Sequence, residues 1–211
     1  MSELFVLTER PSVYLASKSP RRQELLRQLG VEFELLLLRE APGRRRDIVE
    51  TPRKDEHPVE FVKRMARTKA SVGWHRMERR ALTPKPVIGA DTEVVLDGAT
   101  IGKPADAAGA VAMLAALSGR SHEVVTGVAV RWQTHLAMAV STSRVAFRAI
   151  PKDEIERYVA TGEPFDKAGA YAIQGKAAAF VQHIEGSYSG VVGLPLFETA
   201  EMLSRIGFPV L

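Results

Sequence analysis

The sequence predicts a mixed α/β fold in which a curved β-sheet is flanked by helices around a central cleft. Strand-like and helix-like runs alternate in the first third of the chain, and two long valine-rich runs follow one another near its middle. One domain over residues 13–207 accounts for this order, with residues 1–12 as a short extension. A division into two lobes near residues 103–106 is the alternative.

The first elements follow from local signals. An apolar strand over residues 13–17 leads into a helix over residues 19–29. Ser19 is a suitable N-cap, Pro20 a suitable first helical residue and Gly30 a C-terminal stop.

The later elements follow from hydrophobic periodicity and from turn residues such as the hairpin signal Asp97-Gly98. Strands are expected over residues 33–38, 87–90, 93–96, 100–101, 122–133, 136–148, 171–173 and 180–184, with 122–133 and 136–148 as an antiparallel pair. Helices are expected over residues 58–80, 107–117, 151–160 and 196–205.

The composition excludes several classes of protein. The 211 residues include no cysteine, so disulfides, thiolate metal sites and cysteine nucleophiles are excluded. Apolar runs are too short to span a bilayer and the first residues lack a secretory signal, which predicts a cytoplasmic protein. The net charge is only +4 and the basic clusters carry no interleaved aromatic residues, which disfavours a nucleic-acid interface.

Two arginines at the start of the first helix suggest an anion site. Arg21 and Arg22 fall in the first helical turn, where the helix dipole favours negative charge instead. Free amide groups, the positive dipole end and two guanidinium groups together suit a phosphate. The alternative is an ordinary solvated arginine or a structural ion pair.

Four further side chains could carry chemistry. Asp91 follows an apolar run, as catalytic carboxylates of α/β enzymes do, or it is a turn aspartate. Lys103 suits a phosphate or is a surface lysine, and Lys69 points into a cleft or extends to solvent from the apolar side of its helix. Gln174 could read a base edge or lie exposed beside a turn glycine.

Common catalytic motifs are missing from the sequence. It contains no Walker loop, no nucleophile elbow and no zinc-protease motif, and its five histidines show no ligand spacing. A Mg²⁺ or Mn²⁺ ion bound through one or two carboxylates and substrate phosphates remains compatible.

Several ordered motifs together resemble the Maf family of nucleotide pyrophosphatases. They lie at residues 15–26, 66–70, 89–92, 103–104, 117–119, 166–175, 186–188 and 191–195. The resemblance implies a fold similar to that of the inosine triphosphate pyrophosphatases. It also implies metal-assisted hydrolysis of a nucleoside triphosphate to the monophosphate and pyrophosphate, and a homodimer.

The resemblance also implies roles for individual residues. Asp91 matches the catalytic acid-base position, acting as general base or as metal ligand. Phosphate-side positions are matched by Ser17, Arg22, Lys69 and Lys103, and substrate-choice positions by Arg21, Thr92 and Gln174. Thr and Gln at the last two indicate the dTTP/UTP branch. The expected metal ligands are Asp91 and Glu40, the nearest acid after the second strand.

Two other functions stay open within this resemblance. One is a pyrophosphatase of the same fold acting on 7-methyl-GTP or other modified nucleotides. The other is a regulatory protein of cell division acting through protein contacts, which would not need Asp91.

Overall fold

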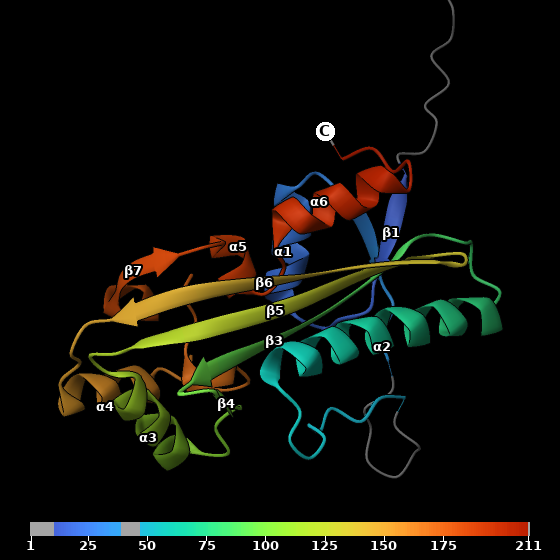
Figure 1. Cartoon of the computed structure of the whole chain (residues 1–211). Coiled ribbons are helices and arrows are strands. Elements are labelled where there is room, and N and C mark those ends of the chain that lie inside the picture. Colours follow the sequence, from blue (N-terminus) through green and yellow to red (C-terminus); the bar gives the residue numbers. More distant parts are fainter. Residues whose placement is uncertain (1–10, 39–46, 211) are drawn as a thin grey trace, which may run out of the picture.

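A computed structural model describes residues 11–38 and 47–210. Its centre is a mixed seven-stranded sheet with the order β2-β1-β3-β5-β6-β7, in which β4 pairs with β3 (Figure 1). The strands are β1 (Ser12–Leu15), β2 (Glu32–Leu35), β3 (Val87–Leu96), β4 (Ala99–Ile101), β5 (Ser121–Trp132), β6 (His135–Phe147) and β7 (Val181–Glu185). Strand β1 runs parallel to β2 and β3, whereas β3, β5, β6 and β7 pair antiparallel.

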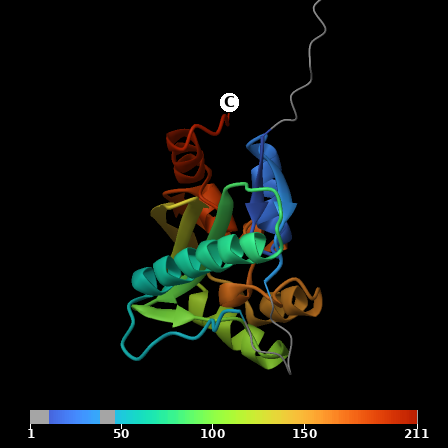
Figure 2. The same cartoon turned by 90° about the vertical axis from the view of Figure 1, so that its right-hand side faces the viewer.

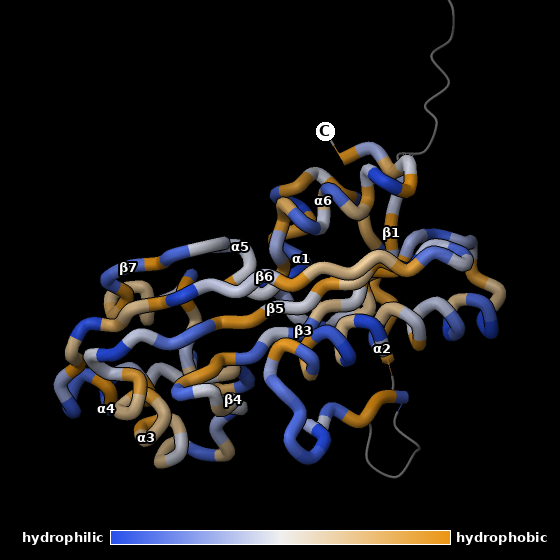
Figure 3. The backbone as a smooth tube through the Cα atoms, in the orientation of Figure 1, coloured by the Kyte–Doolittle hydropathy of each residue, from blue (hydrophilic) through white to orange (hydrophobic). Residues whose placement is uncertain are grey.

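The helices cover both faces and one end of this sheet (Figures 1 and 2). They are α1 (Pro20–Gln28), α2 (Pro58–Arg79), α3 (Ala107–Leu117), α4 (Lys152–Ala160), α5 (Tyr188–Val192) and α6 (Leu196–Arg205), with 3-10 helices η1 (Ala168–Ala170) and η2 (Lys176–Phe180). The long helix α2 lies along β3 and β5. Hydrophilic and hydrophobic segments alternate along it, as expected of a helix that packs on one side only (Figure 3).

Two glycines let α2 approach the sheet closely. A Cβ on Gly89 would lie 2.5 Å from the backbone oxygen of Ala66, and one on Gly127 would lie 2.6 Å from that of Val62. Any larger residue at either position would push α2 away from the strands. This contact also settles which side chains of β3 face the helix, because residues alternate between the two faces of a strand.

The edge of β3 is open along a short stretch. Strand β1 pairs with β3 only as far as Ile88, and β4 begins to pair at Val94. Among the described residues, 89–93 therefore have no strand neighbour on that side. Side chains from both faces of β3 can reach this gap, and the candidate site lies there.

Most expected elements are confirmed, including the antiparallel pair β5 and β6 and the hairpin at Asp97-Gly98. The expected strands over 87–90 and 93–96 form one continuous strand, so Asp91 and Thr92 lie in its middle and not at a strand end. The expected strand over 171–173 is wrong, because this segment has no strand partner and turns directly into η2.

The short helix α5 and both 3-10 helices were not expected from the sequence. Within the described ranges, no helix is long and apolar enough to cross a membrane.

Candidate active site

A cavity of about 740 Å³ opens at the gap in the edge of β3. Each predicted site residue that the structure describes lines it: Ser17, Arg21, Arg22, Lys69, Asp91, Thr92, Lys103 and Gln174. Glu40, the expected second metal ligand, lies outside the described residues.

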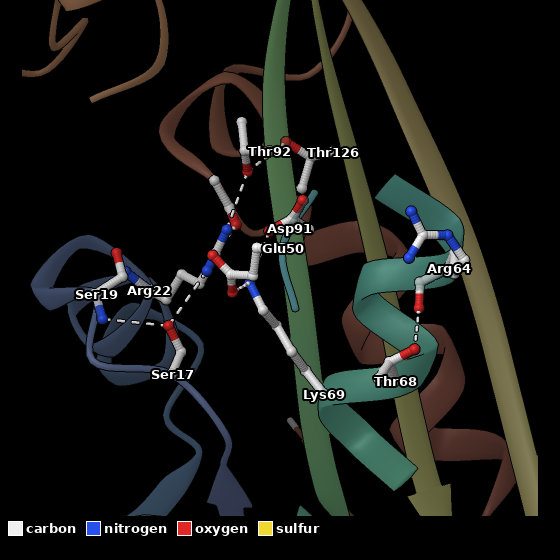
Figure 4. A network of polar contacts seen from close by, with 11 residues as sticks. Ser17, Ser19, Arg22, Glu50, Arg64, Thr68, Lys69, Asp91, Thr92 and Thr126 are labelled. Carbon is white, nitrogen blue, oxygen red and sulfur yellow. Dashed lines mark hydrogen bonds and ion pairs between the residues drawn. The ribbon is translucent and has the colours of Figure 1, made fainter. Parts of the chain in front are cut away.

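Arg22, in the first turn of α1, is held by acceptors from three separate segments (Figure 4). Its Nε donates to the backbone oxygen of Gly193 at 2.8 Å, and its two terminal nitrogens donate to Ser17 Oγ and Thr92 Oγ1, each at 3.2 Å. Burial lowers the pKa of Arg22, and the charge of Asp91 opposes this shift. Arg22 is therefore not a solvated side chain but a fixed cation in the cavity wall.

The start of α1 has the form expected from the sequence. Ser19 is the N-cap and accepts a hydrogen bond from the backbone N–H of Arg22 at 3.5 Å, and Pro20 begins the helix. The neighbouring Arg21 also lines the cavity, and burial lowers its pKa. The helix start therefore presents two guanidinium groups, as an anion site requires.

Lys69 joins two carboxylates at the centre of the site (Figure 4). Its ammonium nitrogen lies 2.7 Å from Asp91 Oδ1 and 2.6 Å from Glu50 Oε1. Only 9% of Lys69 is exposed, so it points into the cavity and does not extend to solvent. Burial alone would raise the pKa of Glu50, but Lys69, Lys103 and Arg22 outweigh that effect and lower it.

Glu50 was missed as a site residue because residues 47–57, where it lies, carry charges of both signs, which is typical of a solvated loop. Two ion pairs with α2 hold this loop: Arg64 with Glu56, and Arg76 with Asp47, each at 2.5 Å. The Arg64 guanidinium lowers the pKa of Glu56 to about 2. No local signal separates Glu50 from the other acids of the loop, because only its contact with Lys69 distinguishes it.

A third carboxyl group lines the cavity beside Asp91. Glu93 follows Asp91 by two positions, so both lie on the face of β3 that carries α2. Burial and the charge of Asp91 raise the pKa of Glu93 to about 7. Across the described part of the chain, no group of three or more His, Cys, Asp or Glu residues is arranged to hold a metal ion.

The turn that carries Gln174 lines the cavity, and the side chain of Glu163 stabilises it. Gln174 lies in the turn before η2. Behind it, the carboxylate of Glu163 accepts from the backbone N–H groups of Lys176 at 3.1 Å and Ala177 at 3.4 Å, and from the Tyr158 hydroxyl at 2.9 Å. A long-range carboxylate therefore caps η2, which has no cap from its own N-terminal residue.

Lys167 is a further cation of the wall that was missed. Its ammonium group donates to the backbone oxygens of Glu163 at 2.6 Å and Phe165 at 3.3 Å. Burial and the charge of Arg21 lower the pKa of Lys167. The motif 166–175 contained Lys167, but its position beside Arg21 depends on the tertiary structure.

The chain is similar to known proteins over nearly its whole length. The family model described as Maf-like protein matches residues 12–206. A dTTP/UTP pyrophosphatase of Nitrosomonas europaea is 52% identical over 198 residues, which is 94% of this chain and 96% of the relative. A dTTP/UTP pyrophosphatase of Nitrosospira multiformis is 55% identical over 193 residues, which is 92% of this chain and 93% of the relative. A dTTP/UTP pyrophosphatase of Aromatoleum aromaticum is 52% identical over 199 residues, which is 94% of this chain and 97% of the relative.

Proposed function

Because the chain belongs to the Maf family, we propose that it hydrolyses dTTP and UTP to the nucleoside monophosphate and pyrophosphate. The observation that carries this proposal is the contact between Lys69 and Asp91, a buried ammonium group beside a carboxylate in a cavity rich in cations. Such a pair combines phosphate recognition with a proton acceptor in one position.

The charge of the cavity suits a triphosphate. Arg21, Arg22, Lys69 and Lys103 all line it, and together they can balance the roughly four negative charges of a nucleoside triphosphate. Arg22 is held by its contacts with Ser17, Thr92 and Gly193 before any ligand binds, so little reorganisation is needed. Fixed cations of this kind stabilise the charge that develops on the phosphate in the transition state.

Asp91 is the proton acceptor in this proposal. Water attacks the α-phosphorus, pyrophosphate leaves, and the Asp91 carboxylate takes the proton of the attacking water. A positioned base of this kind contributes about 10²–10⁴-fold to a rate. Lys69 donates to Asp91 Oδ1, so the proposal assigns the proton to the second oxygen of the carboxylate.

A divalent cation fits the oxygen donors of this cavity. Mg²⁺ takes one or two protein carboxylates and completes its shell with water and phosphate oxygens, so a site of three protein ligands is not needed. Asp91 and Glu50 supply such oxygens, since both contact the same ammonium group. A bound Mg²⁺ or Mn²⁺ ion would add to the neutralisation of the triphosphate. Glu40 as a metal ligand and a homodimer stay predictions from the family resemblance, and a cytoplasmic location stays a prediction from the composition.

The choice of base is assigned in this proposal to Arg21, Thr92 and Gln174, with Gln174 as the direct contact. An amide both donates and accepts, which matches the alternating groups on the edge of thymine or uracil. Gln174 is exposed in this structure, and once a bound base covers it, leaving one group without a partner costs about 1–3 kcal/mol. A base whose edge does not pair with both groups of the amide would therefore bind less well.

The test is pyrophosphate release with Mg²⁺ or Mn²⁺ from dTTP, UTP, CTP, GTP and 7-methyl-GTP. We expect dTTP and UTP to be the best substrates and Asp91→Asn to lower their turnover about 10²–10⁴-fold. Asp97→Asn is the matched control, because Asp97 is exposed at the β3–β4 turn and pairs with Arg120. Preference for 7-methyl-GTP, or full turnover in Asp91→Asn, would contradict the proposal.

A further inference from the structure

Thr126, on β5, is a buried hydroxyl next to the active site but outside the cavity lining. Its exposed fraction is 0%, and it pairs across the sheet with Thr92. Its Oγ1 lies 2.8 Å from the backbone oxygen of Gly190 and 3.0 Å from Thr92 Oγ1 (Figure 4). No substrate atom can reach it, so any effect on the reaction must pass through a neighbour.

Thr126 is the donor in both of its contacts. Its single hydroxyl proton is shared between the backbone oxygen of Gly190 at 2.8 Å and Thr92 Oγ1 at 3.0 Å. Thr92 Oγ1 also accepts from a terminal nitrogen of Arg22 at 3.2 Å. The Thr92 oxygen is therefore an acceptor for both neighbours.

The Thr92 oxygen is held between two donors, Arg22 on the side of the cavity and Thr126 behind it. The bond from Thr126 limits the positions that this oxygen can take relative to the Arg22 guanidinium group. We propose that Thr126 is a positioning residue that fixes Arg22 for the triphosphate by holding the Thr92 hydroxyl as an acceptor. This inference rests on the proposed function and extends it to a residue behind the cavity wall.

The proposal adds a second role for Thr92 to the choice of base. Its oxygen accepts from Arg22 and Thr126, so Thr92 also acts on the phosphate side of the site through Arg22. A defect at Thr126 should weaken the turnover of all nucleoside triphosphates alike, because Thr126 does not contact the base. A defect at Gln174 should instead change the ratio between them.

The experiment compares Thr126→Val with Thr126→Ser, using kcat and KM for dTTP, UTP and CTP. Valine keeps the shape and removes the hydroxyl, whereas serine keeps the hydroxyl and removes a buried methyl group. We expect Thr126→Val to lower kcat/KM about 3- to 10-fold for all three nucleotides, the effect of one lost hydrogen bond, and Thr126→Ser to stay within about twofold of wild type. Both variants should melt at lower temperature, so activity will not follow stability.

Two controls separate positioning from folding. Thr199→Val removes another fully buried threonine hydroxyl that donates to a backbone oxygen, that of Pro195 at 2.7 Å, and should leave kcat/KM unchanged. In a double-mutant cycle, Thr126→Val should lower kcat/KM less than about twofold when Thr92 is already valine.

Three results would overturn the proposal: normal kcat/KM in Thr126→Val, equal losses in the valine and serine variants, or losses that add fully in the cycle. If wild type hydrolyses no nucleoside triphosphate, the proposed function fails. If wild type is active and Thr126→Val matches it, only this inference fails.

Discussion

Lys69 and Asp91 lie on different elements, 22 residues apart in sequence, and their side chains meet at 2.7 Å. The contact depends on Gly89, two positions before Asp91, because a side chain there would collide with the backbone of α2 at Ala66 and Ala70. The same close approach buries Lys69 and directs it at the cavity. The central charge pair is therefore a product of how tightly helix and strand pack.

Replacing Lys69 by methionine should lower kcat/KM for dTTP about 10- to 100-fold. The phosphates lose one buried charge-assisted hydrogen bond, and such bonds contribute about 1.5–3 kcal/mol. Asp91 and Glu50 also lose the ammonium group that both contact. Steady-state kinetics checks this, with Lys63→Met as control, because Lys63 is exposed on the same helix and pairs with Glu60. Equal kinetics for Lys69→Met and the control would contradict it.

Replacing Gln174 by glutamate should lower kcat/KM for dTTP about tenfold or more while affecting CTP and GTP less. Glutamate keeps the size of the side chain but cannot donate, so one group on the base edge loses its partner. A panel of nucleotides measured at one metal concentration checks the ratio. Gln182→Glu is the control, since Gln182 is exposed on β7. Equal losses for all nucleotides would assign Gln174 to the phosphates instead.

Replacing Glu163 by glutamine should loosen the turn that carries Gln174. One of its two acceptor oxygens becomes an amide group, which cannot accept from Lys176, Ala177 or Tyr158. We expect the free energy of unfolding to fall by about 1–2 kcal/mol. Urea unfolding measures this, with Glu156→Gln on the exposed side of α4 as control. A variant as stable as the control would show that the cap contributes nothing.

His122 should make stability depend on pH in the acidic range. It is buried against the rings of Phe147 and Tyr171, and burial lowers its pKa from 6.5 to about 4. The unfolded chain binds a proton at His122 below pH 6.5, and the folded chain does so only near pH 4. This contribution to stability is therefore complete above pH 6.5 and is lost as the pH falls towards 4.

The expected loss is about 2 kcal/mol between pH 7.5 and pH 5. Urea unfolding of wild type and His122→Gln at these two pH values checks it, because the variant should lack this part of the decrease. His135→Gln is the control, since His135 is exposed at the start of β6. A decrease of the same size in wild type and His122→Gln would rule out this origin.

Elements with local signals could be predicted from the amino-acid sequence. Ser19 and Pro20 set the start of α1, Asp97-Gly98 set the hairpin, and the periodicity of α2 set its buried side, because capping, turn geometry and amphipathicity depend on residues a few positions apart. The motifs also identified eight of the side chains that line the cavity, since their order along the chain is itself the signal, but not Glu50 or Glu93.

The contacts between these residues depend on long-range packing, which the sequence pattern does not show. Glu50 reaches Lys69 because ion pairs with α2 hold its loop, and Thr126 reaches Thr92 because the register of β3 and β5 pairs them. The segment over 171–173 has the composition of a strand but lacks a neighbour to pair with, so it forms a turn. Register, helix approach and strand partners involve residues far apart in the chain, and no local pattern of side chains specifies them.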